Sequence, residues 1–214
     1  MEADELMSSR AVDSPESTPE STPERTPERL PERPGAEVTV KRAAELAGSA
    51  LHELCDAADA AILDGGGFGW LKPPPRHVME AYWKGVLLVP ERELVIGRLD
   101  GVVAGSAQLM RPPKNNEAQA FTGQLTTYFV APWARGHGLA RSLVLAVEGA
   151  ARDAGLRALN LDVRETQERA ITVYEQLGYQ RWGSHPRYAW IDGRWHTGLY
   201  YVKDLGGEHE TLSA

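Results

Sequence analysis

The chain has 214 residues, of which 42% are hydrophobic, so it can bury one core or two small ones. Its net charge of -7 is uneven, because residues 1–37 carry ten acidic and four basic side chains and the rest is nearly neutral. A near-neutral folded part excludes the basic surface that nucleic-acid binding needs. No apolar run is long enough for a membrane helix, and the acidic start is unlike a secretion signal. The single cysteine, Cys55, excludes an internal disulfide and is typical of a reducing, cytoplasmic compartment.

Residues 1–37 form a compositionally distinct tail in which Pro-Glu returns every four residues from Pro15 to Pro31. Proline at this density removes backbone donors, and there is almost nothing apolar to bury. We therefore predict a disordered tail at 1–37, acting as a spacer or, alternatively, as a docking segment. A single folded domain is predicted at 38–206 and a frayed end at 207–214.

In the first half of that domain we expect a short strand at 38–41, a helix at 43–63 and a second helix at 75–85. The helices are separated by a glycine-rich segment that carries Phe68 and Trp70. Two strands at 94–99 and 102–109 follow, joined by Asp100-Gly101, a two-residue hairpin signal. Cys55 shares an apolar helical face and is predicted to be a core residue.

In the second half, a β-rich run at 125–130 ends before Pro132, and a glycine-spaced loop leads into a helix. A strand is predicted at 156–163, where apolar residues alternate with polar ones, followed by a helix at 168–177. Two last strands, 188–191 and 195–202, flank a second hairpin signal at Asp192-Gly193. This order predicts an α/β (α+β) domain with a mixed sheet and helices packed against it.

The loop Arg135–Ala140 delivers its backbone into a helix N-terminus. The first amides of a helix lack internal partners and, with the helix dipole, attract an anion such as a pyrophosphate. Gly136 and Gly138 let the main chain curl around phosphate oxygens. A dinucleotide fingerprint would need a third glycine, and a Walker loop would need Gly-Lys-Ser/Thr. The alternative is a glycine turn without a ligand.

Two segments resemble the GNAT N-acetyltransferase superfamily. Its acetyl-CoA signature is matched by Arg135, Gly138 and Ala140, and a second segment, VRETQERAITVYEQLGY at 163–179, is similar to a further family motif. Gln167 stands where asparagine is usual. Within the superfamily the chain is most similar to the tabtoxin-resistance type of acetyltransferase, through Ser106–Leu109, Leu161-Asp162 and the tail 188–205.

The resemblance implies a GNAT-type single domain with a mixed, mostly antiparallel sheet of about seven strands and about four helices. Its central parallel strands are expected to diverge and to form a slot for acetyl-CoA, the co-substrate. The implied cofactor-binding residues are Tyr128, Phe129, Val130, Arg135, Gly136, His137, Gly138, Leu139, Ala140 and Gln167. Most of these contacts are expected to be made by the main chain, and no metal is expected.

For catalysis, the resemblance implies Tyr174 as the acid that protonates the departing thiolate, since a phenol is protonated at neutral pH. The alternative is a tyrosine packed on the sheet. Asp162 is the implied general base, with Glu165 and His185 as possible replacements. Gln124 departs from the subfamily, which has a glutamate there, and an amide cannot accept the proton.

The expected activity is acetyl transfer from acetyl-CoA to a primary amine of a small molecule by direct attack on the thioester. Phe68, Trp70 and the loop 186–188 are expected to wall the acceptor site. A protein or peptide amine is the alternative substrate, and a non-catalytic acyl-CoA-binding module with a partner-recruiting tail is the alternative function. We expect a monomer or homodimer that binds neither nucleic acid nor membrane.

Overall fold

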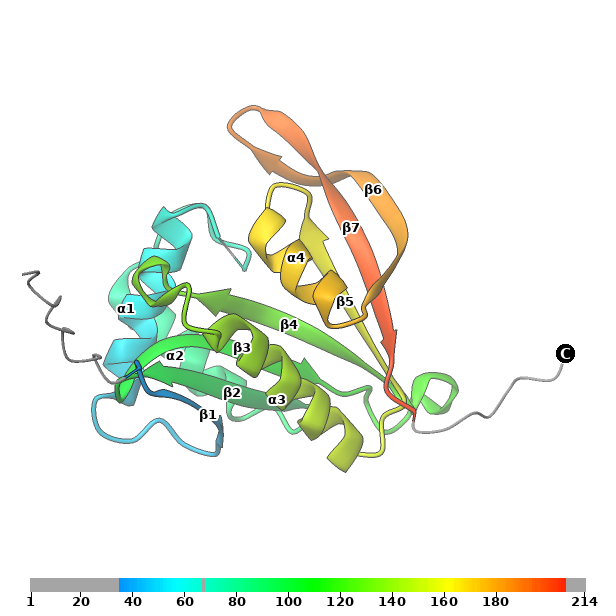
Figure 1. The fold of residues 1–214 in the computed structure, drawn as a ribbon, viewed down its shortest axis with the longest axis horizontal. Helices are drawn as coiled ribbons and strands as arrows, with labels where there is room; N and C mark the ends of the chain where they lie inside the picture. Colours follow the sequence, from blue (N-terminus) through cyan, green and yellow to red (C-terminus); the bar gives the residue numbers. More distant parts are fainter. Residues whose placement is uncertain (1–34, 67, 207–214) are drawn as a thin grey trace, which may run out of the picture. The chain divides into compact units, whose positions relative to one another are not determined.

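The structure is a computed structural model that describes residues 35–66 and 68–206 (Figure 1). The predicted tail at 1–37, apart from its last three residues, and the predicted frayed end at 207–214 lie outside the described residues. The strands are β1 Val38–Ala43, β2 Arg92–Leu99, β3 Val102–Met110, β4 Thr122–Val130, β5 Ala158–Arg164, β6 Gln180–Ile191 and β7 Arg194–Asp204. The helices are α1 Ala50–Leu63, α2 Arg76–Val86, α3 Leu139–Asp153 and α4 Glu168–Gln176, with short 3-10 turns at Glu117–Gln119 and Pro132–Ala134.

The seven strands form one sheet in the order β1-β2-β3-β4-β5-β7-β6. Within the described residues β4 and β5 are the parallel pair, and the neighbouring strands elsewhere in the sheet are antiparallel. The predicted fold class is thus confirmed, including its mostly antiparallel sheet and four helices.

The parallel pair is short, and its two strands then separate. β4 and β5 pair only over Thr122–Gln124 and Ala158–Asn160, and beyond these residues they diverge (Figure 1). β4 is irregular at this point, since Thr127 has a φ of +49° and the β3–β4 register shifts nearby. A Cβ on Gly105 of β3 would lie 2.5 Å from the Phe129 carbonyl oxygen, so a glycine is needed for the two strands to approach there.

Both predicted hairpins are present. Asp100 and Gly101 have φ values of +50° and +82°, and Asp192 and Gly193 have +49° and +75°. Two successive positive φ values are the signature of the type I′ turn, whose twist matches that of the strands. β6 is much longer than predicted, since it begins at Gln180 and pairs along β7 with two register shifts.

The helix predicted at 43–63 begins seven residues later than expected. β1 continues to Ala43, which pairs with Leu94 of β2, and Gly48 has a left-handed φ of +60° just before α1. A pairing with a strand fifty residues away therefore overrides the local helical pattern. The periodicity of α2 predicts an inward face of Val78, Ala81 and Tyr82 or Trp83. The structure buries Trp83, as predicted, together with Met79 and Val86, whereas Val78 and Ala81 are exposed.

The sheet has a core on each face. α3 and α4 cover the front face in Figure 1, and their core includes Val95, Leu143, Leu161 and Val163. α1 and α2 cover the other face, where Leu54, Trp83, Leu94 and Ile96 are buried together with Cys55, as predicted. No helix in the described part of the chain has the length and apolar character that crossing a bilayer requires.

Candidate active site

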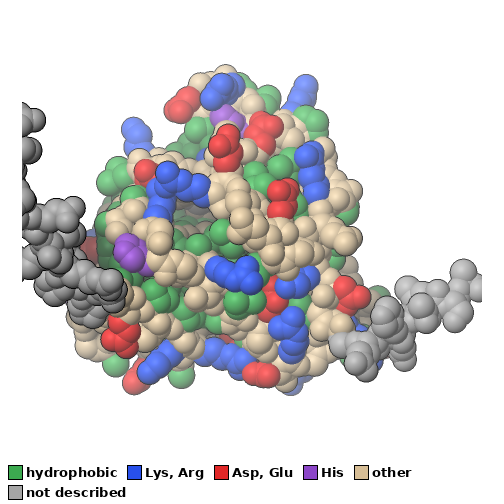
Figure 2. Space-filling view, in the orientation of Figure 1, with side chains coloured by type: hydrophobic (Ala, Val, Ile, Leu, Met, Phe, Trp, Pro, Cys, Tyr) green, Lys and Arg blue, Asp and Glu red, His purple; other side chains and the backbone are tan. Residues whose placement is uncertain are grey.

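A cavity of about 1410 Å³ opens where β4 and β5 separate. Figure 2 shows the face that α3 and α4 cover, which is hollowed and has Lys and Arg side chains around the hollow. The lining comes from five segments that are distant in sequence: the α1–α2 connection, β4, the loop before α3, the end of β5 with the start of α4, and the tip of β6. The diverging strands therefore create the room for two reactants.

The glycine loop forms one wall of this cavity. Gly136 and Gly138 have φ values of +84° and +79°, and a Cβ on either would meet nothing within 4 Å. α3 begins directly after Gly138 without a side-chain cap and without an acidic residue in its first turn. Its first amides are thus open to an anion, which fits the diphosphate of a coenzyme A thioester.

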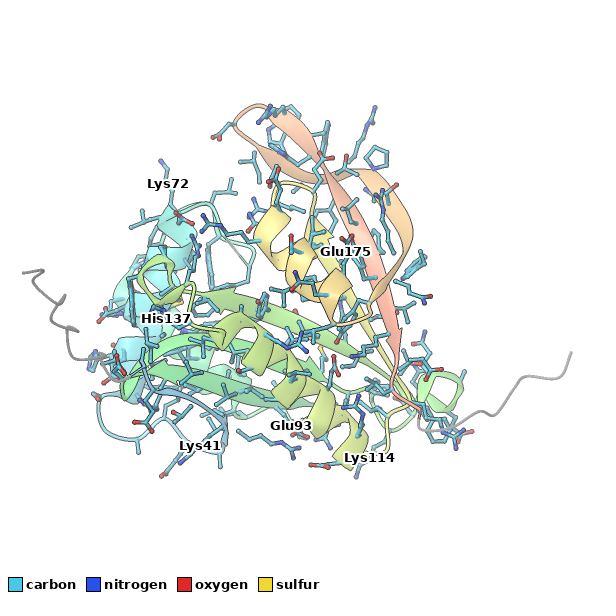
Figure 3. The ribbon with its side chains drawn as sticks, in the orientation of Figure 1. Lys41, Lys72, Glu93, Lys114, His137 and Glu175 are labelled. Carbon is cyan, nitrogen blue, oxygen red and sulfur yellow. The ribbon has the colours of Figure 1, made fainter. Side chains whose placement is uncertain are left out.

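The side chains of the loop Arg135–Ala140 lie in different surroundings. Arg135 donates to the cavity-lining carboxylate of Asp64, with 2.6 Å between Nη2 and Oδ2. Leu139 is buried against Gly97, so only its backbone remains for a ligand, while Ala140 lines the cavity. His137, labelled in Figure 3, is exposed and lies outside the lining.

The predicted β4 residues lie along the cavity with their side chains directed to different neighbours. The Phe129 ring stacks on Phe68 at 5.2 Å on the α1/α2 side, and Val130 packs into the α3/α4 core. The Tyr128 ring lies 5.5 Å from Tyr174. Because β5 no longer pairs with β4 beyond Gln124, the β4 edge here faces the cavity with its peptide groups.

Tyr174 of α4 lines the cavity and is otherwise enclosed. Its side chain is 3% exposed, and its ring is surrounded by Tyr128, Tyr179 and Tyr201 at 5.5 to 6.4 Å. Burial is the main reason that the pKa of the Tyr174 phenol lies well above its ordinary value, and nearby Tyr128, Tyr179 and Asp162 raise it further. The phenol therefore keeps its proton at neutral pH.

Asp162 of β5 also lines the cavity, and both of its oxygens are held. Gln124 Nε2 donates to Oδ1 at 3.1 Å, and the Tyr188 hydroxyl donates to Oδ2. Burial and this hydrogen bond to Asp162 raise the pKa of Tyr188, so its hydroxyl stays a donor at neutral pH. Gln124, which cannot act as a base itself, thus positions the carboxylate that can.

The other candidate residues lie in different surroundings. Gln167 lines the cavity and donates to the carbonyl oxygen of Gly65 at 3.0 Å. Glu165 accepts from the Thr197 amide at 2.9 Å, is exposed and lies outside the cavity lining, as does His185. Of the carboxylate and imidazole candidates for the base, only Asp162 therefore reaches the cavity.

Aromatic rings enclose the α1/α2 side of the cavity. Phe68 and Trp70 pack edge to face at 5.6 Å, and Tyr82 contacts both. Tyr188 and Trp190 of β6 line the cavity from its other side. In the described residues no group of three or more His, Cys, Asp or Glu is arranged to hold a metal.

Three contacts at the site were missed by sequence reasoning: Asp64 with Arg135, Tyr188 with Asp162, and Arg164 with Gly65, whose carbonyl oxygen is 2.7 Å from Arg164 Nη2. Arg164 follows Asp162 by two residues, so the alternation of β5 could have placed it on the same face. The other two contacts join segments far apart in sequence, and no local pattern marks them.

The parallel strands β4 and β5 separate beside the loop Arg135–Ala140, whose free amides at the start of α3 form an anion site, called the anion cradle below. The carboxylate of Asp162 and the protonated phenol of Tyr174 line the same cavity. This combination is typical of a group-transfer enzyme. The sequence profile of the acetyltransferase (GNAT) family matches residues 51–179. An uncharacterized N-acetyltransferase from the hisH-hisA intergenic region of Azospirillum brasilense is 66% identical over 133 residues, which are 62% of this chain and 79% of that protein.

Solved structures show the same fold. An N-acetyltransferase from Staphylococcus aureus Mu50 is 19% identical with a TM-score of 0.68, covering 79% of this chain and 99% of that one. A phosphinothricin acetyltransferase from Sinorhizobium meliloti, in complex with acetyl-CoA, is 20% identical with a TM-score of 0.64, covering 79% and 89%. The chain belongs to the acetyltransferase (GNAT) family and is an N-acetyltransferase.

Proposed function

We propose that this acetyl-CoA-dependent N-acetyltransferase transfers the acetyl group to a primary amine of a small molecule by direct attack on the thioester. The observation that carries the proposal is a single cavity lined by the loop before α3, by Tyr174 and by Asp162. Direct transfer needs both reactants side by side, because proximity supplies much of the rate enhancement.

In this proposal the peptide groups of Tyr128–Val130 hold the pantetheine arm and the loop Arg135–Ala140 holds the diphosphate. The open backbone at Gly136 and Gly138 supports this assignment. Acetyl-CoA supplies the activated acetyl group. In the structure Arg135 contacts Asp64 and Gln167 contacts Gly65, both in the α1–α2 connection. To bind the cofactor, each of these two side chains would have to contact it in addition to its present partner or in place of that partner.

Asp162 is proposed to take the proton of the attacking ammonium, directly or through Tyr188. The Tyr188 hydroxyl already donates to Asp162, so it can pass a proton to the carboxylate while it accepts one from the amine. Tyr174 is proposed to donate its proton to the departing thiolate. Its burial next to the split in the sheet supports this role, since a raised pKa keeps the phenol protonated.

A small acceptor is favoured by the aromatic enclosure that Phe68, Trp70, Tyr188 and Trp190 give to the cavity. A peptide amine would have to pass the same rings. We also propose that the chain is of the tabtoxin-resistance type within the family, with the domain spanning 38–206. The tail at 188–205 supports this placement, because it supplies Tyr188 to the site.

Two measurements on the full chain test the proposal. Calorimetric titration with acetyl-CoA should give saturable binding, and a thiol-release assay over a panel of small amines and short peptides should show turnover with at least one small amine. Absence of acetyl-CoA binding would refute the proposal as a whole. Binding with turnover of peptides alone would refute the small-molecule assignment.

A further inference from the structure

Arg164, the last residue of β5, is a half-buried cation in the cavity wall. Its guanidinium donates to the Gly65 carbonyl oxygen at 2.7 Å, and no carboxylate of the described residues forms an ion pair with it. A guanidinium carries five N–H donors, so most of them remain for another acceptor. Burial lowers the pKa of Arg164 from its ordinary value, and Tyr188 partly opposes this effect, but the group stays charged.

The direction of Arg164 follows from strand alternation. Leu161 and Val163 point into the α3/α4 core, so Asp162 and Arg164 leave the sheet on the opposite face. That face carries the α1–α2 connection, to which the Arg164 guanidinium is bound. The anion cradle lies at the start of α3, which packs on the other face of the sheet. Arg164 therefore faces the acceptor side of the cavity.

Asp162 and Arg164 are two residues apart on one strand, so their backbone positions are about 7 Å apart. One is a carboxylate beside the proposed reaction centre and the other is a cation without a partner charge among the described residues. Such a pair is complementary to a molecule that carries an amine and a carboxylate a few bonds apart. A cation that is partly removed from water gains most from a charge-assisted, bidentate hydrogen bond to a carboxylate.

We propose that Arg164 binds the carboxylate of the acceptor, and that the acceptor is therefore a free amino acid. This proposal rests on the proposed function, since it names the substrate class of the same cavity. A further consequence of the proposal is that Arg164 disfavours a peptide N-terminus, in which an amide replaces the carboxylate. The Gly65 carbonyl oxygen holds the guanidinium in place, and Tyr188 lines the same cavity with its hydroxyl donating to Asp162.

The test compares each of the twenty amino acids with its amide in the thiol-release assay, for the wild-type chain, Arg164→Gln and Arg164→Lys. A hydrogen-bonded charge pair predicts that kcat/KM of the wild type is about 10- to 100-fold higher for the acid than for the amide. In Arg164→Gln the acid should lose this advantage through a higher KM, while kcat/KM for the amide and the acetyl-CoA affinity stay the same. Arg164→Lys should keep part of the advantage.

Arg194→Gln is the matched control, because Arg194 is exposed and lies outside the cavity lining. Like Arg164→Gln, this variant loses one positive charge, but it should keep the wild-type preference for the acid over the amide. The proposal is overturned if Arg164→Gln still prefers the acid, if the wild type prefers amides or acetylates no amino acid, or if Arg164→Gln binds acetyl-CoA more weakly. The last result would assign Arg164 to a cofactor phosphate. A wild type that acetylates small amines without a carboxylate but no amino acid would refute this inference and leave the proposed function standing.

Discussion

At the scale of single residues, the protonation state of Tyr174 follows from where α4 places it. A phenol at the surface already holds its proton at neutral pH, and burial among three other tyrosines strengthens that hold. In the proposed mechanism the same enclosure would keep water from the leaving sulfur. A buried donor in a dry site stabilises developing negative charge far more than a donor in water does.

Replacing Tyr174 by phenylalanine should lower kcat by roughly 100-fold, since a positioned acid contributes about that much or more. The ring and its packing are retained, so the melting temperature and the acetyl-CoA affinity should change little. Tyr179→Phe is the control, because Tyr179 is equally buried but lies outside the cavity lining. Thiol release at saturating substrate measures the effect, and undiminished turnover in Tyr174→Phe would remove the residue from the mechanism.

Asp162→Asn should lower kcat/KM by roughly 100-fold at neutral pH, because the amide keeps the shape of the side chain but cannot take the proton. Tyr188→Phe should lower it as well if the hydroxyl relays the proton to Asp162. Both variants are measured by thiol release over a pH series. Glu165→Gln addresses the other carboxylate candidate: full activity in Asp162→Asn, with loss in Glu165→Gln, would reassign the base.

At the scale of elements, α1 is fastened to β3 by one carboxylate. Glu53 accepts from Ser49 Oγ at 2.5 Å, from the Val103 amide at 2.9 Å and from Arg98 Nη1 at 3.2 Å. The hydrogen bond from Ser49 is the main cause of a lowered pKa for Glu53, with the Val103 amide next and Arg98 also contributing. Because α1 leads into Asp64 and Gly65, this attachment also positions a wall of the cavity.

Glu53→Gln should therefore destabilise the fold by about 2 kcal/mol at pH 7, the size expected of hydrogen bonds to a charged group. A lowered folded-state pKa contributes stability above the ordinary value of 4.5 and loses it as the pH falls through the lowered value. Denaturant unfolding should show a difference between wild type and Glu53→Gln at pH 7 that vanishes in acid. Glu45→Gln, an exposed carboxylate, should show little difference at either pH; a pH-independent loss in Glu53→Gln would contradict the linkage.

Elements whose signals are local were predicted well, and those that depend on distant pairing were not. Asp100-Gly101 and Asp192-Gly193 each specify their turn, and the structure has both hairpins. The start of α1 was placed too early, because Ala43 is held in β1 by a strand that comes fifty residues later. The length of β6 was underestimated for the same reason, since its pairing with β7 decides it.

The candidate site likewise has features that the local sequence predicts and contacts that depend on distant segments. The loop at Gly136 and Gly138 is a local motif, and its conformation follows from residues within one turn of each other. The hydrogen bond between Tyr188 and Asp162 joins β6 to β5, although β7 lies between them in the sheet. The ion pair of Arg135 with Asp64 spans about seventy residues, so only the folded chain brings these charges together.

At the scale of the folded domain, the cavity connects the two faces of the sheet. A sheet normally separates its two cores, but the divergence of β4 and β5 leaves an opening between them. In the proposed function, the loop before α3 holds the cofactor from one face, and the aromatic residues and Asp162 receive the acceptor from the other; all of them line this cavity. Ligand binding on one side should then stabilise the whole domain, because all strands share one sheet.

Acetyl-CoA at about 100 times its Kd should stabilise the native state by about 2.7 kcal/mol and raise the melting temperature by roughly 5 to 10 °C. Gly138→Leu should abolish this rise, because a side chain at a φ of +79° strains the loop and fills the space before α3. Gly155→Leu is the matched control, with a φ of +75° at the other end of α3 and outside the cavity lining. Both variants should melt at a lower temperature without ligand, but only Gly155→Leu should keep the acetyl-CoA shift. An equal shift in both would show that the cofactor is held elsewhere in the molecule.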